Sequence, residues 1–331
     1  MKALITGAAG FVGSHLVERL LSGQDEVVGI DSFADFYARS LKEENLAAIG
    51  ERRGFTFVEG DLNEVPLRPL LEGCDVVYHL AGQPGVRPSW GAEFSVYLRR
   101  NVEATQRLLE ALRAMPVRKL LFASSSSVYG DAETYPSSEA MRPQPVSPYG
   151  VTKLAAEHLC ELYRVNFGVP TASLRLFTVY GPRQRPDMAF ARLVRAAIRG
   201  EKFELYGDGE QTRDFTFVSD VVKAMQDAAS SDWCGVANIG GGSRTSMNQV
   251  IDLVERLAGS VTVTRRAPQH GDVRHTAADI GVAAAAFGYA PATILAAGLE
   301  DMVAWERSRP VSATQRTGDA TFRPVRASDA V

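Results

Sequence analysis

The stretch Thr6-Gly7-Ala8-Ala9-Gly10-Phe11-Val12-Gly13 follows an apolar run at residues 2–6 and opens an amphipathic segment at residues 11–22. Glycines at this spacing permit a tight turn and let backbone N–H groups approach a phosphate at the positive end of a helix. The spacing GxxGxxG is one residue wider than the GxGxxG of the common dinucleotide loop. The stretch predicts a strand, a phosphate-binding turn and a helix, although glycine-rich turns alone are weak evidence.

Outward from this loop, strand-like apolar runs alternate with helical patterns through the first half of the chain. Strands are predicted at 2–6, 26–30, 55–59, 75–79 and 118–123, and helices at 11–22, 41–50, 63–72 and 92–114. Regular alternation of this kind predicts βαβ units, and therefore a parallel sheet with helices on both faces. Right-handed crossovers bring the carboxyl ends of the strands to one edge, where ligands bind.

The second half of the chain has a less regular pattern. A helix is predicted at 148–167 and a sixth strand at 171–175, followed by helices at 187–199, 218–229, 246–258 and 291–307 and strands at 203–206, 213–217 and 236–239. We therefore expect a dinucleotide-binding domain over residues 1–175 and a smaller mixed α/β substrate lobe over 176–310 that partly returns to the main sheet. The polar segment 311–331 is expected to be a flexible tail.

Composition excludes several classes of function. The chain has 331 residues, 45% hydrophobic and 23% charged, with a net charge of −3, so nothing suggests nucleic-acid binding. No apolar stretch reaches the 18 residues or so that a membrane span requires. Cys74, Cys160 and Cys234 are far apart and lack metal-ligand spacing. We expect no disulfide framework, no metal site and a cytoplasmic location.

An acidic residue ends the second predicted strand. Asp31 lies 18 residues after Gly13, where a carboxylate can bind both hydroxyls of the adenosine ribose. An acid there repels a 2′-phosphate, and no arginine follows in Ser32-Phe33-Ala34, so NAD is favoured over NADP. A helix cap or turn is the alternative role for Asp31. Asp61-Leu62, after the third strand, could reach the adenine, or Asp61 could simply cap the next helix.

A tyrosine and a lysine share one face of the helix predicted at 148–167. Tyr149 and Lys153 are spaced i and i+4, which places the phenol beside the ammonium group. Tyrosine, with an ordinary pKa near 10, is a poor base at neutral pH. A lysine cation, assisted by the positive nicotinamide of NAD, would lower that pKa. A surface Tyr–Lys pair is the alternative, because this spacing is common by chance.

Four consecutive serines, Ser124 to Ser127, follow the fifth strand at the ligand edge of the sheet. There they can donate hydrogen bonds to a hydroxyl or keto oxygen of a substrate, although a polar loop would look the same. The glycine loop, the acid, the serine run and the Tyr/Lys pair occur in this order on alternating elements. Together they predict a redox site that uses NAD.

At these residues the chain resembles the extended short-chain dehydrogenase/reductases that act on nucleotide sugars, from residue 1 to about residue 308. Within that group it is most similar to the UDP-glucuronate 4-epimerases, in the segments DSFADFY (31–37), HLAGQPGVR (79–87), NVEAT (101–105) and RQRPDMA (183–189). The resemblance implies a Rossmann-type doubly wound parallel sheet with a smaller substrate lobe. It also implies a homodimer that pairs the long helices near 92–114 and 148–167.

The resemblance also implies roles for individual residues. Ser125 and Tyr149 contact the 4-oxygen of the sugar, with Tyr149 as base, and Lys153 orients Tyr149 and the nicotinamide ribose. The implied cofactor-binding residues are Gly7, Gly10, Phe11, Val12, Gly13, Asp31, Ser32, Asp61, Leu62, Leu80, Ala81, Gly82, Asn101, Ala123, Tyr149 and Lys153. The implied substrate-binding residues are Arg87, Ser125, Ser126, Ser127, Thr178, Arg185, Arg192, Gln211, Arg213 and Arg274.

Among the substrate-binding residues, Ser126, Ser127, Thr178 and Arg185 are assigned to the sugar carboxylate. Arg213 and Arg274 are permanent cations suited to the diphosphate, and a surface salt bridge is the alternative role for each. Arg192 is a candidate for either anion, or for a solvated surface position.

The function that follows is interconversion of UDP-glucuronate and UDP-galacturonate through a 4-keto intermediate, with tightly bound NAD. Epimerisation of UDP-glucose or UDP-N-acetylglucosamine, and decarboxylation of UDP-glucuronate, are the enzymatic alternatives. A 4,6-dehydratase is disfavoured, because the resemblance would then require an Asp-Glu pair where this chain has Ser126-Ser127. A non-catalytic NAD(P)-sensing regulator is the alternative of another class, but such proteins usually lose the tyrosine or the lysine.

Overall fold

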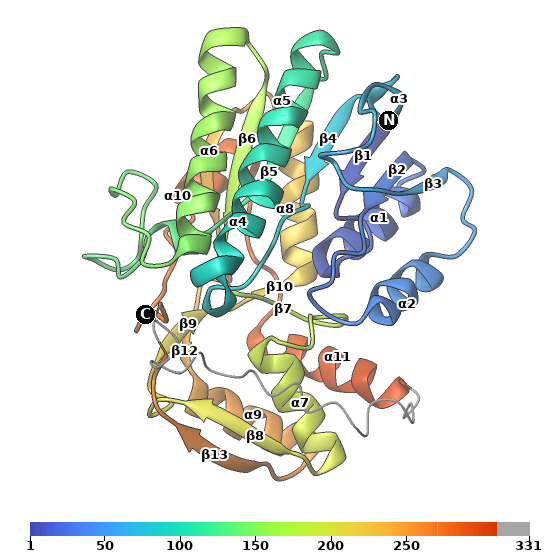
Figure 1. Ribbon diagram of the computed structural model, residues 1–331. Helices are drawn as coiled ribbons and strands as arrows, with labels where there is room; N and C mark the ends of the chain where they lie inside the picture. The colour runs from blue at the N-terminus through green and yellow to red at the C-terminus, as the bar shows by residue number, and fades with distance from the viewer. Residues whose placement is uncertain (270, 310–331) are drawn as a thin grey trace.

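The computed structural model describes residues 1–269 and 271–309. The tail predicted at 311–331 lies outside these residues. Figure 1 shows a larger lobe built on a parallel sheet, and a smaller lobe of helices and short strands beyond the carboxyl ends of the sheet strands.

Seven strands form the main sheet in the order β11-β6-β5-β4-β1-β2-β3, and all neighbours are parallel. They are β1 (Lys2–Thr6), β2 (Glu26–Asp31), β3 (Phe55–Glu59), β4 (Val76–His79), β5 (Lys119–Ser125), β6 (Thr171–Leu176) and β11 (Gly235–Ile239). The predicted doubly wound α/β fold is confirmed. Because the strand order reverses between β1 and β4, a ligand crevice is expected at the carboxyl ends of these two strands.

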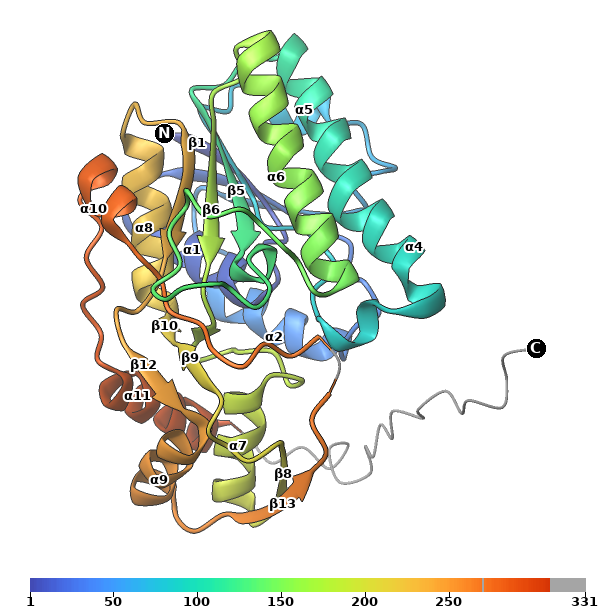
Figure 2. The same ribbon diagram turned by 90° about the vertical axis from the view of Figure 1, so that its left-hand side faces the viewer.

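Helices cover both faces of the sheet, as Figures 1 and 2 show. One face carries α1 (Phe11–Ser22), α8 (Val218–Ser230) and α10 (Gly281–Phe287), with α2 (Arg39–Ile49) packed beside α1. The other face carries α3 (Arg68–Leu71), α5 (Ala104–Ala114) and α6 (Pro148–Phe167). Strands covered on both faces are buried throughout, which explains their continuous apolar sequence.

Helix α6 begins and ends at the predicted residues because the residues at both of its ends favour helix termination. The Ser147 hydroxyl accepts a hydrogen bond from the Gly150 backbone N–H at 3.1 Å, and Pro148 occupies the first helical position. Gly168 ends the helix in the left-handed conformation, at φ 69°.

Two predicted helices are wrong as single elements. The segment 92–114 divides into a 3₁₀ turn (Gly91–Glu93), α4 (Phe94–Tyr97), a π-helical turn (Leu98–Glu103) and α5. The wide turn directs Asn101 into the interior, where its side chain is fully hydrogen-bonded. The segment 63–72 contains only α3, because Pro66 and Pro69 each remove a backbone N–H.

The smaller lobe packs three helices against a parallel strand pair. These are α7 (Ala189–Arg199), α9 (Met247–Ala258) and α11 (Leu295–Ser308), with β8 (Lys202–Tyr206) beside β13 (Thr262–Arg266). Two short pairs, β7 (Val179–Tyr180) with β10 (Thr216–Phe217) and β9 (Thr212–Asp214) with β12 (Arg244–Ser246), join the lobes. Strands β7, β12 and β13 and helix α10 were not predicted.

No helix in the described part of the chain combines the length and the hydropathy that crossing a bilayer demands.

Candidate active site

A cleft of about 3230 Å³ is lined by residues from both lobes at the carboxyl edge of the sheet. Pockets for one small molecule are several times smaller, so this cleft has room for a dinucleotide and a second ligand together. The predicted site residues that line it are Gly7, Gly10, Phe11, Val12, Gly13, Asp31, Ser32, Asp61, Leu62, Leu80, Ala81, Gly82, Arg87, Ala123, Ser125, Ser126, Ser127, Tyr149, Lys153, Thr178, Arg185, Arg192 and Gln211. Asn101, Arg213 and Arg274 are not among its lining residues.

The glycine loop has the shape that a pyrophosphate requires. No side chain caps α1, so the backbone N–H groups of its first turn open toward the cleft. Gly7 has φ +73°, and a Cβ there would lie 2.9 Å from the Ala81 backbone nitrogen. A Cβ on Gly13 would overlap the carbonyl oxygen of Gly7. Side chains larger than hydrogen at Gly7 and Gly13 would clash with backbone atoms and distort the loop, so the glycines keep the shape that fits a dinucleotide phosphate.

The Asp31 carboxylate has a partner that the sequence analysis missed. Its Oδ1 accepts hydrogen bonds from the Phe33 backbone N–H at 2.9 Å and from the Lys42 ammonium at 2.8 Å. Both side chains of the ion pair are buried. Lys42 occupies an inward-facing position of α2, three residues before Asn45 and seven before Ile49. A lysine on the buried face of a predicted helix was the available signal for this pair.

Asp61 and Asn101 support backbone turns around the cofactor side of the cleft. Asp61 Oδ1 accepts the Asn63 backbone N–H at 2.9 Å in a turn, and α3 begins only at Arg68, so Asp61 does not cap the next helix. The buried Asn101 amide bonds both the N–H and the carbonyl of Gln83, at 2.6 and 3.1 Å, and also the Thr152 hydroxyl at 3.0 Å. Asn101 therefore shapes the loop after β4 from behind.

Tyr149, Lys153 and Ser125 meet where α6 passes the end of β5. The Lys153 ammonium is buried and donates to the Ala123 carbonyl at 2.9 Å. Ser125 shares a hydrogen bond with the Tyr149 phenol, and its Oγ also accepts the Ser127 backbone N–H at 3.1 Å. The Tyr149 ring packs edge-on against Tyr97, with ring centroids 6.3 Å apart. The three predicted side chains thus form one group at the cleft.

Burial changes the acidity of both ionisable members of this group. It raises the pKa of Tyr149, and the Ser125 hydrogen bond and the Arg185 charge oppose that increase. From the sequence, Lys153 and the nicotinamide were expected to lower the pKa of Tyr149, whereas in the protein alone that pKa is raised. Burial also lowers the pKa of Lys153 to about 8, because a desolvated ammonium is disfavoured.

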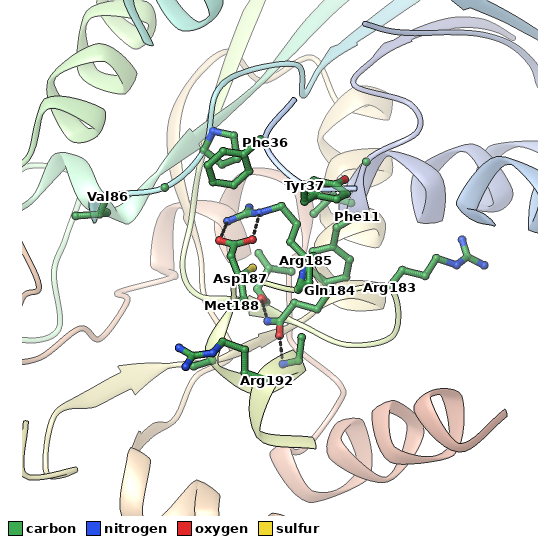
Figure 3. A pocket seen from close by; sticks show the side chains of 18 of the residues that line it. Phe11, Phe36, Tyr37, Val86, Arg183, Gln184, Arg185, Asp187, Met188 and Arg192 are labelled. Carbon is green, nitrogen blue, oxygen red and sulfur yellow. Dashed lines mark hydrogen bonds and ion pairs between the residues drawn. The ribbon is translucent and has the colours of Figure 1, made fainter. Parts of the chain in front are cut away.

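The hydroxyl-rich end of the cleft lies beside an ion pair. Ser126 and Ser127 open the 3₁₀ turn after β5, and Thr178 follows β6. Figure 3 shows the Arg185 guanidinium directed at Asp187, with two hydrogen bonds of 3.0 Å each, and the Phe36 ring nearby. The guanidinium carbon is 5.7 Å from the Phe36 ring centroid. The Arg185 guanidinium, which was assigned to a sugar carboxylate, thus already binds the carboxylate of Asp187.

The remaining predicted arginines have protein partners. Arg213 donates to the backbone carbonyls of Thr212, Val273 and Arg274, and Arg274 forms an exposed ion pair with Asp208. The predicted alternative for Arg274, a surface salt bridge, is what the structure contains. Neither residue is among those that line the cleft, so their assignment to the diphosphate stays a prediction.

The outer wall of the cleft contains Arg87, Arg192 and Gln211. Arg87 stacks on Tyr206, with its guanidinium carbon 4.2 Å from the ring centroid, and pairs with Asp272 at 2.7 Å. Arg192 lies 3.7 Å from Glu204. The buried Gln211 Oε1 has no hydrogen-bond partner within residues 1–269 and 271–309, so it can accept a hydrogen bond from a ligand.

Known proteins are similar to this chain along most of its length. The model of the NAD dependent epimerase/dehydratase family matches residues 3–240. An uncharacterized UDP-glucose epimerase of Bacillus subtilis is 45% identical, over 92% of this chain and 98% of that protein. UDP-glucuronate 4-epimerase 6 of Arabidopsis thaliana is 37% identical, over 92% of this chain and 71% of its own.

A solved structure shares the whole architecture. UDP-glucuronic acid 4-epimerase from Bacillus cereus, crystallised with UDP-glucuronic acid and NAD, is 43% identical to this chain. It superposes with a TM-score of 0.90, over 93% of this chain and 99% of that one. Since the family model covers most of the sequence and these relatives cover nearly all of it, the chain belongs to the NAD dependent epimerase/dehydratase family.

Proposed function

We propose that this protein is an NAD-dependent UDP-glucuronate 4-epimerase, an isomerase that interconverts UDP-glucuronate and UDP-galacturonate. The observation that carries the proposal is one cleft that combines the Ser125, Tyr149 and Lys153 group with the Ser126, Ser127 and Thr178 hydroxyls. Residues 1–175 bind NAD, and residues 176–310 mainly bind the UDP-sugar. The relatives from Bacillus cereus and Arabidopsis thaliana support this choice of substrate.

In the proposed reaction Tyr149 removes the proton of the sugar 4-hydroxyl, and Ser125 donates a hydrogen bond to the same oxygen. NAD, which the glycine loop and Asp31 would hold, would supply the acceptor for the C4 hydride and the donor for its return to the opposite face of the sugar. Lys153, held by the Ala123 carbonyl, keeps a positive charge near the phenolate. Tyr149 then returns the proton, so the full cycle has no net oxidation.

The 4-keto form of a uronate is a β-keto acid, which loses CO₂ readily. An epimerase must hold the carboxylate away from the geometry that aligns its C–C bond with the ketone. The hydroxyls of Ser126, Ser127 and Thr178 lie at the cleft and can fix the carboxylate plane by hydrogen bonds. Arg185, whose charge acts on Tyr149, supplies a cation at the same cleft.

Product analysis tests the proposal directly. The purified protein is incubated with UDP-glucuronate without added NAD, and the products are identified by NMR. UDP-galacturonate with little pentose is expected. Exclusive formation of UDP-xylose would identify a decarboxylase, and the absence of any turnover of uronates would refute the proposal.

The activity is expected to decline above a pH of about 8, because the deprotonated Lys153 no longer stabilises the phenolate. Since the charged form is lost as the pH rises through this value, kcat/KM falls on the alkaline side. The measurement is a pH profile of kcat/KM for UDP-glucuronate. In Lys153→Arg, which stays charged at these pH values, the alkaline decline should disappear even if the rate is low. An unchanged alkaline limb in this variant would assign it to another group.

Arg185→Met is expected to lower kcat/KM for UDP-glucuronate by roughly 10- to 100-fold, the usual effect of losing a hydrogen bond to a charged group. The variant also leaves the Asp187 carboxylate unpaired beside the anionic sugar. UDP-glucose, which lacks the carboxylate, should be affected far less.

Asp187→Asn is the matched control, because it frees the Arg185 fork and should raise kcat/KM for UDP-glucuronate. Steady-state kinetics on both sugars make the comparison. An equal loss on both sugars in Arg185→Met would remove Arg185 from carboxylate recognition.

We also propose a homodimer and a cytoplasmic location. The outer side of α6 exposes Val151, Leu162, Val165 and Phe167, and Leu98 is exposed on the neighbouring π-helical turn. Large apolar side chains on adjacent helices favour pairing with a second copy, and sedimentation equilibrium measures the resulting mass. The three free cysteines fit a reducing compartment.

A further inference from the structure

A chain of buried polar side chains runs behind the proposed catalytic group, through residues that the proposed reaction does not use. It connects Ser124 on β5, Glu157 on α6, Arg175 on β6, Tyr129 after β5 and Asn238 on β11. Each of the five is at least nine-tenths buried. The polar chain therefore crosses three neighbouring strands and the helix that carries Tyr149.

Glu157 is the centre of this network. Its Oε2 accepts hydrogen bonds from the Ser124 hydroxyl at 2.6 Å and from Arg175 Nε at 3.1 Å. Its Oε1 accepts a second guanidinium bond at 2.6 Å, so the ion pair is bidentate. Taking two charges out of water is costly unless every donor and acceptor is satisfied.

The rest of the network satisfies the arginine. Arg175 Nη1 donates to the Tyr129 hydroxyl at 2.8 Å, and this hydroxyl donates to Asn238 Oδ1 at 2.7 Å. Asn238 then bonds the backbone carbonyls of Ser137 and Asp279. A buried polar network that is fully paired is rigid, because each of its bonds fixes the next.

The position of Glu157 links this network to the proposed chemistry. Glu157 follows Lys153 by four residues and Tyr149 by eight, so the three share one face of α6. Ser124 lies between Ala123 and Ser125 in the chain. The carbonyl of Ala123 accepts a hydrogen bond from the Lys153 ammonium. The end of β5 is therefore joined to α6 at two consecutive residues, through Lys153 and through Glu157.

We propose that Glu157 and Arg175 are positioning residues, which act through Ser124 to hold the Ser125 hydroxyl within hydrogen-bond reach of Tyr149. The proposal rests on the catalytic roles proposed for Ser125 and Tyr149. The Ser125 hydrogen bond opposes the effect of burial on the Tyr149 pKa. A shift of Ser125 should therefore be visible in the acidity of the phenol as well as in the rate.

Ser124→Ala is the informative variant, because it removes the bond between the strand and Glu157 and leaves the ion pair intact. Removing Glu157 itself would leave the Arg175 charge buried without a partner and endanger folding. Ser173→Ala is the matched control. Ser173 is an equally buried serine on the adjacent strand β6 and, unlike Ser124, does not line the cleft, so the Tyr149 pKa is the readout that separates positioning from a direct contact with the ligand.

Three quantities are measured on the NAD-loaded protein: the melting temperature, kcat and KM for UDP-glucuronate, and the pKa of Tyr149. The pKa is obtained by ultraviolet difference titration against Tyr149→Phe in each background. Ser124→Ala is expected to lower kcat by up to about 100-fold, the loss that a misplacement of 1 Å can cause, with little change in KM, and to raise the pKa of Tyr149. Ser173→Ala should change neither kcat nor the Tyr149 pKa. Ser124→Thr keeps a hydroxyl at this position, so its kcat and its Tyr149 pKa should both be close to the wild-type values.

A purely structural network gives a different result. Ser124→Ala would then lower the melting temperature and leave both kcat and the Tyr149 pKa as in Ser173→Ala, which would overturn the proposal. The titration needs no turnover. A wild-type protein that fails to epimerise UDP-glucuronate, but whose Tyr149 pKa rises in Ser124→Ala, would refute the proposed function and leave the positioning role supported.

Discussion

Tyr149→Phe is expected to reduce kcat for UDP-glucuronate about 1000-fold, within the range that general acid–base catalysis contributes. The variant removes one oxygen atom and keeps the ring that packs edge-on against Tyr97. Without the phenol, no described side chain next to Ser125 can take the 4-hydroxyl proton, because Lys153 donates to a backbone carbonyl. The fold and the NAD content should be unchanged.

Tyr97→Phe is the matched control for this experiment. The Tyr97 hydroxyl donates to the carbonyls of Pro84 and Gly85, at 2.8 and 2.9 Å, and does not reach Ser125. Its loss should cost less than tenfold in kcat. NMR product assays and the absorbance of bound cofactor measure both variants. If Tyr149→Phe kept a tenth or more of the wild-type rate, another group would be the base.

Local signals in the sequence predicted the elements that build the nucleotide side of the cleft. Helix α1 and helix α6 begin and end as predicted, because glycine, serine and proline set their termini through interactions within a few residues. The β5 serines and Tyr149 follow from the same logic, since a parallel sheet brings its carboxyl ends to one edge. For such elements, neighbours in sequence supply the deciding contacts.

Contacts between distant segments could not be predicted in this way. Glu157 and Arg175 are 18 residues apart, and each looks like an ordinary charged residue of its helix or strand. The resemblance assigned Arg213 to the diphosphate, and its charge suits that anion, while in the structure its guanidinium donates to backbone carbonyls about 60 residues away. A permanent cation is equally suited to either partner, and only the tertiary fold decides between them.

The same limit applies to the division of the segment 92–114. The buried residues of this segment recur every three or four positions from α4 to α5. The π-helical turn keeps this spacing, so the sequence pattern does not reveal it. The turn exists because the Asn101 amide finds partners on the loop after β4 and on α6. Pairing of this kind depends on elements that lie far apart in the sequence.

Gly13→Ala is expected to abolish retention of NAD, because the added methyl group would overlap the Gly7 carbonyl oxygen. The loop that carries the Gly7 carbonyl cannot easily move away from the added methyl group. Gly7 has a positive φ, and the loop around it is tied to β2 by hydrogen bonds from the Gly7 and Ala8 N–H groups to the Ile30 carbonyl, at 2.8 and 3.2 Å. Helix α1 must therefore move away from the loop, which misaligns the N–H groups that would bind the pyrophosphate.

Overpacking of this kind costs about 1–3 kcal/mol and occasionally more, so the melting temperature should fall by several degrees. The cofactor content of the purified protein, measured by absorbance after denaturation, should fall below about a tenth of the wild-type value, because the helix end supplies both the donors and the dipole.

Gly23→Ala is the matched control at the other end of α1, where φ is −82° and the nearest atom to the added carbon is 3.3 Å away. It should keep its NAD. If Gly13→Ala also copurified with a full complement of NAD, the loop would not be the pyrophosphate site, and the assignment of the whole nucleotide side of the cleft would fail with it.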